Sequence, residues 1–334
     1  MSRRNIAGGP LFSSEVLVGM LKATQSLGVS PERSLRAAGF DPAVLKKPPT
    51  YVPWNACAQL FDLLAEEARC PHFGLLILTR EPPVNIGVFN RLLRAAPNLG
   101  VALRLTVKHL PVWNQAIRWR LTSDKNVVHF AREEVRAGPG AHRQVGYMGV
   151  GGAVVGIQAL VDRNWRPLSV AFTHSRPRDV HPFSDFFQVP VRFGQSYSGF
   201  SLRIDDLERP MPTRDDVLFD VLVQHVNALH RSPPRGDIVA ETQGLIRRHL
   251  GSGPCGLNDV ARLLALHPKA LQRELARHGT SFSSILEDLR YQLASEYLAS
   301  TRLSLAEVAP MVGLSEASAL SRGLRSRRER AASR

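Results

Sequence analysis

Apolar residues recur three and four positions apart through most of the first part of the chain, which is the spacing expected of helices buried on one face. Helices with this pattern are predicted over residues 14–27, 53–68, 73–78, 87–96 and 99–113, with a shorter one between Pro31 and Gly39. Glycine and proline separate these segments, as they commonly do between helices. The pattern therefore predicts a mainly helical beginning.

The period of the pattern changes after residue 115. Apolar and polar residues alternate over 116–121 and 127–132, and the turn-forming residues 122–126 lie between them, so a β-hairpin is predicted. Further strands are predicted at residues 168–173 and, as a last pair, at 190–194 and 199–204; helices are predicted at 143–161 and 181–187. This mixture predicts an α+β domain.

Four segments are predicted along the chain. Residues 1–12 are expected to form a disordered leader, and residues 13–210 the α+β domain. A connecting helix and a linker follow over residues 211–236, because the Pro-rich and Gly-containing stretch 231–236 is typical of a linker. Residues 237–334 are expected to form a second domain that is entirely helical.

One short pattern occurs twice in this last segment. The first copy contains Leu257, Val260, Ala261 and Leu264, and the second contains Leu305, Val308, Ala309 and Val312. Each copy buries one face of a short helix and carries a small residue where another helix can cross closely. Each is followed by a turn and a second helix: Pro268 is a typical first helical residue, and Ser304 with Glu307 fits a capping box. The pattern predicts two helix-turn-helix units.

A longer helix is predicted between the two units, over residues 283–300. Its apolar stripe consists of Ile285, Leu286, Leu289, Leu293 and Tyr297. A helix of this length spans roughly 25–27 Å. With the flanking turns, the second helices of the two units could lie about 34 Å apart, which is one turn of DNA. One chain could therefore present two helices to successive major-groove segments.

The region from Cys255 to Arg325 resembles the DNA-binding domain of the AraC/XylS family of bacterial transcription regulators. The matching residues are Leu257, Val260–Ala261, Leu271–Arg273, Gly279–Phe282, Leu293–Ala294, Tyr297–Leu298, Leu303–Ala309, Gly313–Glu316 and Ser318–Arg322. Residues 164–174, 183–187, 189–194 and 207–212 resemble the arabinose-binding-like N-terminal domain of one branch of these regulators. The resemblance implies an α+β effector domain before an all-α DNA-binding domain. It also implies double-stranded promoter DNA, a small-molecule effector, RNA polymerase and a second copy of the chain as partners.

Polar residues three and four apart on the predicted helix after Pro268 form one exposed face: Lys269, Gln272 and Arg273. Gln pairs with adenine and Arg with guanine in the major groove. The resemblance implies the same role for Ser318 and Arg322 on the second such helix. His267, at the start of the first helix, and Arg325, in the arginine-rich end of the chain, complete the predicted DNA contacts. The alternative is that these residues form an ordinary solvated face.

The second unit departs from the family pattern at several positions. Pro310 lies within its first helix, where proline removes a hydrogen bond. Gly323 lies within its second helix, which glycine weakens by roughly 1 kcal/mol relative to alanine. The usual aromatic-Gly-x-Ser-Pro ending is replaced by an arginine-rich end, which could bind phosphates without reading sequence. In the first unit, Ala265 stands where a glycine with positive φ is usual.

The net charge of +14 favours a polyanionic partner. The excess is spread along the chain, however: residues 237–334 contain 14 Lys and Arg against 10 Asp and Glu. The charge therefore supports nucleic-acid binding only weakly, and the tandem motif is the stronger argument. Three unclustered cysteines, Cys57, Cys70 and Cys255, indicate reduced thiols and a cytoplasmic location, and no apolar run is long enough to span a membrane.

Other chemistry is poorly supported by the sequence. Residues 146–156 are glycine-rich but lack the Gly-Lys-Ser/Thr ending of a phosphate loop, so a closely packed helix is predicted there. No metal-spaced His or Cys cluster and no GxSxG motif occurs, so neither a cofactor nor catalysis is expected. Trp113, Trp119, His129 and Tyr147 are candidates for lining an effector site. Two alternatives to a specific regulator stay open: an enzyme or small-molecule-binding protein with a degenerate helical tail, and a non-specific nucleic-acid binder.

Overall fold

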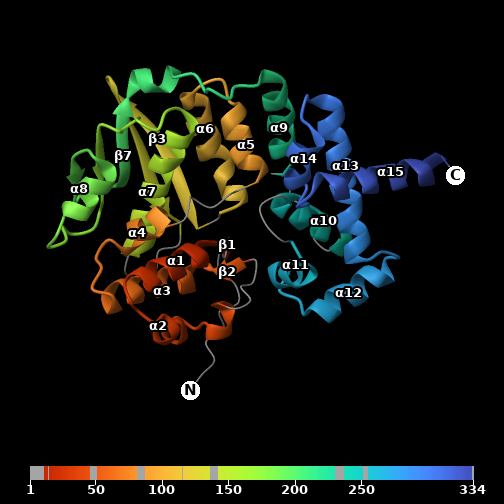
Figure 1. The fold of residues 1–334 in the computed structure, drawn as a ribbon, viewed down its shortest axis with the longest axis horizontal. Helices are drawn as coiled ribbons and strands as arrows, with labels where there is room; N and C mark the ends of the chain where they lie inside the picture. Colours follow the sequence, from red (N-terminus) through yellow and green to blue (C-terminus); the bar gives the residue numbers. More distant parts are fainter. Residues whose placement is uncertain are drawn as a thin grey trace. The chain divides into compact units, whose positions relative to one another are not determined.

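The computed structural model describes residues 11–13, 15–45, 51–80, 87–114, 116–135, 142–229, 237–250 and 255–332. The chain divides into two units (Figure 1). The first comprises Met1–Val84 and Pro97–Thr213, and the second comprises Asn85–Ala96 and Arg214–Arg334. Most of the predicted leader and the whole of the predicted linker 231–236 lie outside the described residues; Leu11 and Phe12, at the end of the leader, belong to strand β1.

The first unit contains a sheet in the order β3-β4-β7-β5-β6. Its strands are β3 (Ile117–Asp124), β4 (Val127–Glu134), β5 (Ser169–Ala171), β6 (Val191–Arg192) and β7 (Ser198–Arg203). The predicted hairpin is confirmed, since β3 and β4 pair antiparallel from Ile117↔Glu134 to Asp124↔Val127. The last two predicted strands are present as β6 and β7, but their predicted pairing is wrong, because β5 lies between them, parallel to β6 and antiparallel to β7.

The first unit also contains helices that the apolar spacing predicted. The helices of the first unit are α1 (Glu15–Ser26), α2 (Glu32–Ala37), α3 (Trp54–Glu67), α4 (Phe73–Arg80), α6 (Leu99–His109), α7 (Arg143–Leu160) and α8 (His181–Phe187). The 3-10 turns η1 (Pro42–Leu45), η2 (Leu110–Val112) and η3 (Ile204–Glu208), and the strand pair β1 (Leu11–Ser13) with β2 (Tyr51–Pro53), complete it. The α+β class predicted for this part of the chain is confirmed.

The glycine-rich stretch forms part of helix α7, as predicted, and its small residues allow close packing. A Cβ on Gly151 would lie 2.8 Å from the side chains of Leu75 and Leu78 on α4. Conversely, a Cβ on Gly74 of α4 would lie 2.1 Å from the backbone oxygen of Gln144 on α7. Such distances are too short for real carbon atoms, so only glycine lets α4 and α7 approach this closely.

The second unit is helical throughout its described residues. Its helices are α5 (Val88–Ala95), α9 (Asp216–Leu229), α10 (Ile238–His249), α11 (Leu257–Leu263), α12 (Pro268–Arg277), α13 (Phe282–Ser300), α14 (Leu305–Met311) and α15 (Ala317–Ala332). Helix α5 packs on α9 within this unit, although its sequence lies inside the segment predicted to form the α+β domain. Its buried side chains, among them Phe89 and Leu92, therefore belong to the core of the helical unit.

Candidate nucleic-acid interface and effector site

The first helix-turn-helix consists of α11 and α12. Val260 and Ala261 on α11 are fully buried, and so are Leu271 and Leu275 on α12. The zero exposure of Ala261 fits the predicted close crossing of helices at a small residue. These buried side chains identify the face of α12 that packs inside the unit, and hence the opposite face, which is exposed to solvent.

The predicted exposed face of α12 is present in the structure. Lys269, Gln272 and Arg273 are all exposed, whereas Leu271 and Leu275 on the same helix are buried. Pro268 is the first residue of α12, and His267 caps the helix: its Nδ1 accepts a hydrogen bond from the backbone N–H of Lys269 at 3.3 Å. His267 thus has a structural task at the position where a DNA contact was predicted.

The turns of the two helix-turn-helix units have the same backbone geometry. In the first, the N–H of Leu266 donates to the oxygen of Ala261 at 2.8 Å, and Ala265 has φ of 56°. In the second, the N–H of Leu314 donates to the oxygen of Ala309 at 2.9 Å. Gly313, in the place of Ala265, has φ of 70°. The positive φ predicted for Ala265 is therefore confirmed, and it is strained for a residue with a Cβ.

The second helix-turn-helix consists of α14 and α15. Its predicted capping box is confirmed: the Ser304 side chain accepts from the N–H of Glu307, and the Glu307 carboxylate accepts from the N–H of Ser304 at 2.9 Å. Hydrogen bonds from Ser304 lower the pKa of Glu307. Pro310 is the penultimate residue of α14, so it interrupts only the last turn of the helix. A proline in this place does not prevent the unit from forming.

Helix α15 presents Ser318, Arg322 and Arg325 as exposed residues. Leu320, on the opposite face, is fully buried. Ser318 is engaged locally, because its hydroxyl donates to the Glu316 carboxylate at 2.8 Å. Arg322 and Arg325 therefore have the exposure that contact with a polyanion requires.

Gly323 has a packing role that its position in the sequence did not suggest. A Cβ at this residue would lie 2.0 Å from the hydroxyl oxygen of Tyr291 on α13. The guanidinium of Arg327 lies over the Tyr291 ring, 5.3 Å from its centroid, and pairs with the Asp288 carboxylate. Arg327 thus ties α15 to α13, although the sequence had suggested a phosphate contact for the arginines at this end.

Arg290 of the helical unit has a structural role that the sequence did not predict. Its side chain on α13 donates from Nη2 to the backbone oxygen of Gly313 at 3.1 Å, in the turn of the second unit. Burial lowers the pKa of this guanidinium. The sequence indicated Arg290 only as a cation within the apolar pattern of α13. That pattern did not identify the residue that Arg290 binds.

The four predicted effector residues do not gather at one place. Trp119 stacks on Phe130 at 4.3 Å in the core. His129 alternates with Phe130 along β4, and its Nδ1 is 2.9 Å from the Ser201 hydroxyl on the other face of the sheet. Tyr147 on α7 is buried, and burial raises its pKa to about 12. Trp113 is half-buried at the end of η2.

A buried ion pair lies on the face of β4 that packs on α7. The Arg132 side chain is 3% exposed, and its Nη1 donates to Oε1 of Glu134 at 2.9 Å. Its guanidinium lies over the Trp54 ring at 5.8 Å from the centroid. Burial lowers the pKa of Arg132, and Glu134 opposes that shift. The alternation Val128, Phe130, Arg132 along β4 places this cation at an inward position, which is the signal that could have found it.

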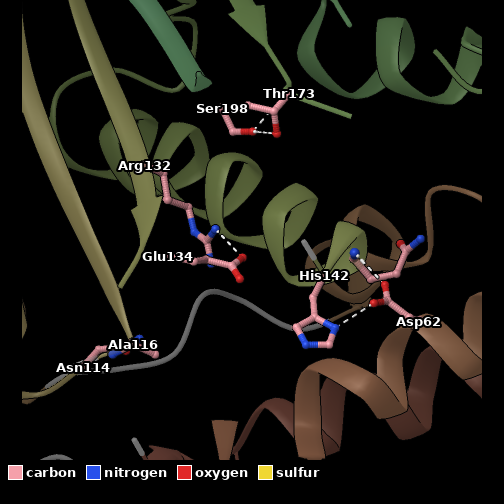
Figure 2. A network of polar contacts seen from close by, with 9 residues as sticks. Asp62, Asn114, Ala116, Arg132, Glu134, His142, Thr173 and Ser198 are labelled. Atoms are coloured by element: carbon pink, nitrogen blue, oxygen red, sulfur yellow. Dashed lines mark hydrogen bonds and ion pairs between the residues drawn. The ribbon is translucent and has the colours of Figure 1, made fainter. Parts of the chain in front are cut away.

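A second polar pair joins α3 to the start of α7 (Figure 2). The Asp62 carboxylate is 3.0 Å from Nδ1 of His142 and accepts from the N–H of Gln144 at 3.1 Å. This hydrogen bond raises the pKa of His142, and Glu134 contributes in the same direction. Burial lowers the pKa of His174, with Arg143 acting in the same sense and Glu134 against it. The buried Arg132–Glu134 pair and the partly exposed His142–Asp62 pair therefore influence one another electrostatically within the first unit.

Two helix-turn-helix units in one helical region, preceded by an α+β domain, define a class of DNA-binding regulator. The family model "Arabinose-binding domain of AraC transcription regulator, N-term" matches residues 28–211, which is more than half of the chain. A helix-turn-helix domain model matches residues 260–333. The chain belongs to the AraC family of transcription regulators, and DNA binding through a helix-turn-helix is a property of that family.

Two relatives, both transcription regulators, agree with this assignment over nearly the full length of the chain. The HTH-type transcriptional regulator VirS of Mycobacterium tuberculosis is 25% identical over 319 residues, covering 95% of this chain and 94% of VirS. The ornithine utilization regulator of Pseudomonas aeruginosa is 26% identical over 332 residues, covering 95% and 92%. The crystal structure of the transcriptional regulator CdpR from Pseudomonas aeruginosa is 19% identical with a TM-score of 0.48, covering 94% of this chain and 95% of CdpR. No helix among the described residues has both the length and the hydropathy needed to cross a membrane.

Proposed function

We propose that this protein reads two successive major-groove segments of promoter DNA, one with α12 and one with α15. We further propose that a small molecule bound by the N-terminal unit controls this binding. RNA polymerase and a second copy of the chain are the protein partners that the family resemblance implies. A specific regulator is thereby preferred to a pure small-molecule binder or a non-specific nucleic-acid binder.

The observation that supports reading by both units is the repeated turn. Because Ala265 and Gly313 share one backbone conformation and the following bonds to Ala261 and Ala309 match, each second helix leaves its turn in the same way. Arg273 on α12 and Arg322 on α15 are both exposed. Arginine contacts guanine through two hydrogen bonds in the major groove. The second helix-turn-helix therefore has the same turn geometry as the first, despite Pro310.

Fluorescence anisotropy of the full-length protein on DNA from upstream of its own gene, against scrambled DNA and across a salt series, tests this proposal. A preference of about a thousandfold or more for the upstream DNA is expected. Arg273→Ala and Arg322→Ala should each weaken that binding by about 1–3 kcal/mol and relax specificity at different base positions. Arg120→Ala, which removes an exposed arginine from the other unit, is the matched control.

The outcomes separate the alternatives. If Arg322→Ala bound upstream DNA like the wild type, with unchanged specificity, base recognition by the second helix-turn-helix would be excluded. Equal binding to both DNAs, declining together with salt, would identify a non-specific binder.

A further inference from the structure

The interior of the first unit contains a guanidinium whose binding edge has no partner. Nε and Nη2 of Arg132 are buried, and neither has a hydrogen-bond partner among the described residues. The same holds for Oε2 of Glu134, whereas Nη1 of Arg132 and Oε1 of Glu134 bind each other. Buried polar atoms are rarely left without partners, because their desolvation is then uncompensated. The Arg132–Glu134 pair therefore keeps buried donor and acceptor atoms that a ligand could bind.

The unpartnered atoms have a defined chemistry. Nε and Nη2 are the two parallel donors on one edge of a guanidinium, and that edge matches the two oxygens of a carboxylate. Oε2 of Glu134 is an acceptor that suits an ammonium or hydroxyl donor. The Arg132–Glu134 pair has no net charge, so a ligand carrying both a carboxylate and an ammonium group would leave the buried group of charges balanced.

The surroundings place these atoms against α7 and α3. A Cβ on Gly149 of α7 would lie 2.5 Å from Nε of Arg132 and 2.9 Å from its Cδ, so glycine is what lets the guanidinium lie there. Trp54, the first residue of α3, covers the guanidinium with its ring. Figure 2 shows the Arg132–Glu134 pair on the strand beside helix α7, which His142 precedes as the N-cap residue.

We propose that the Arg132–Glu134 pair is the effector site, and that its ligand is a small zwitterionic carboxylate of the amino-acid class. The Arg132 edge binds the carboxylate and Oε2 of Glu134 accepts a hydrogen bond from the ammonium group. This inference rests on the proposed function, because it gives the effector its chemical class and its contacts. Because Nε and Nη2 of Arg132 and Oε2 of Glu134 are buried, the parts of the chain that cover them must move before a ligand can enter.

The test is thermal unfolding of the full-length protein, without DNA, in the presence of each of the common L-amino acids. A ligand that binds only the folded protein raises the Tm. At least one amino acid is expected to do so, while its carboxamide and its decarboxylated amine do not. L-Arabinose, a sugar without charge, is the comparison ligand and is expected to have no effect. If no amino acid raised the Tm, or if arabinose alone did, the proposal would be overturned.

Two pairs of variants assign the effect to the Arg132 edge. Arg132→Lys keeps the charge but loses the paired donors, and Gly149→Ala displaces the guanidinium; each should weaken the response by about tenfold or more. Arg120→Lys, on an exposed ion pair of the same sheet, and Gly156→Ala, where a Cβ on α7 meets nothing within 4 Å, should respond like the wild type. An unchanged response in Arg132→Lys would overturn the proposal.

A milder variant guards against misfolding. Glu134→Gln preserves an acceptor for Nη1 of Arg132 but replaces Oε2 by a donor. Amino acids should then lose more affinity than the matching acids without the amino group. DNA binding is measured separately on upstream DNA. Loss of the Tm response with intact specific DNA binding would reject only the proposed ligand site. A normal Tm response without specific DNA binding would reject only the proposed reading of DNA.

Discussion

Ala265 is the residue at which the two helix-turn-helix units differ most plainly in strain. Its φ of 56° is costly for an L-residue with a Cβ, whereas Gly313 adopts 70° in the second turn without that cost. Ala265→Gly is therefore expected to raise the free energy of unfolding of the helical unit by about 1 kcal/mol, and Gly313→Ala to lower it by a similar amount. Urea unfolding followed by circular dichroism measures both. Ala276→Gly, at an exposed helical position, is the control and should be destabilising.

Two histidines of the helical unit make its stability depend on pH. Burial lowers the pKa of His225 to about 4, with Arg247 acting in the same direction. It also lowers the pKa of His249 to about 4, with Arg248 adding to the shift and Asp259 opposing it. The unfolded chain binds protons near pH 6.5 and the folded chain only near pH 4, so stability present above pH 6.5 is lost as the pH falls through this window.

At pH 5 each histidine should cost about 2 kcal/mol of stability relative to pH 8. The measurement is the Tm of the full-length protein from pH 8 to pH 4.5, with hydrogen exchange to assign the transition to α9 and α10. His225→Phe should flatten the dependence, since it removes one titrating group. An exposed control, His181→Gln in the other unit, should leave the slope unchanged. A slope that His225→Phe does not alter would show that this residue is not responsible.

Helix α15 combines arginines with different tasks, although they lie close together in sequence. Arg325 is exposed, whereas Arg327 binds the Asp288 carboxylate, the backbone oxygen of Glu287 and the Tyr291 ring. Arg325→Ala is expected to reduce the salt dependence of DNA binding by about one phosphate contact. Arg327→Ala should leave that slope unchanged and lower the stability of the unit by about 1 kcal/mol. Anisotropy across salt and urea unfolding separate the two; equal slopes for both variants would contradict the assignment.

Helices and strands were predictable where one face of an element is buried in a regular period. The capping box at Ser304, the N-terminal proline of α12 and the hairpin of β3 and β4 depend on local chemistry, which the sequence carries directly. Partners were not predictable, because periodicity shows which face is buried but not what buries it. Gly323 illustrates this: local propensity makes it a weak helix residue, and only the position of Tyr291 shows that a side chain would collide there.

The same limit applies to the proposed effector site. Aromatic residues were chosen as candidates, and one of them, Trp119, lies opposite Arg132 in the register of β3 and β4. Arg132 was overlooked, although its inward position follows from the alternation along β4. Its significance depends on which of its nitrogens find partners, and that is decided by residues distant in sequence, such as Trp54 and Gly149.

At the scale of the whole molecule, the helical unit is built from two separate parts of the chain. The segment Asn85–Ala96 joins it from within the sequence of the α+β domain, and the chain then returns to the first unit. Leu92 of α5 is fully buried, and α5 packs on α9. Arg91, on the same helix, interacts electrostatically with Glu307 of α14. Helix α5 is therefore a structural part of the unit that contains both helix-turn-helix motifs.

This organisation predicts that Leu92→Ala, far from the motifs in sequence, destabilises the DNA-binding unit. Loss of a fully buried leucine side chain typically costs about 2–5 kcal/mol. Hydrogen exchange should become faster in peptides from α5 and α9 and at the Arg91 partner helix α14, and affinity for upstream DNA should fall. Leu35→Ala, which removes an equally buried leucine from α2 of the first unit, is the matched control and should accelerate exchange in α2 and α3 instead. Should Leu92→Ala leave α9 and α14 unchanged while α3 and α4 exchange faster, α5 would belong to the first unit in solution, and the two-part construction of the DNA-binding unit would be wrong.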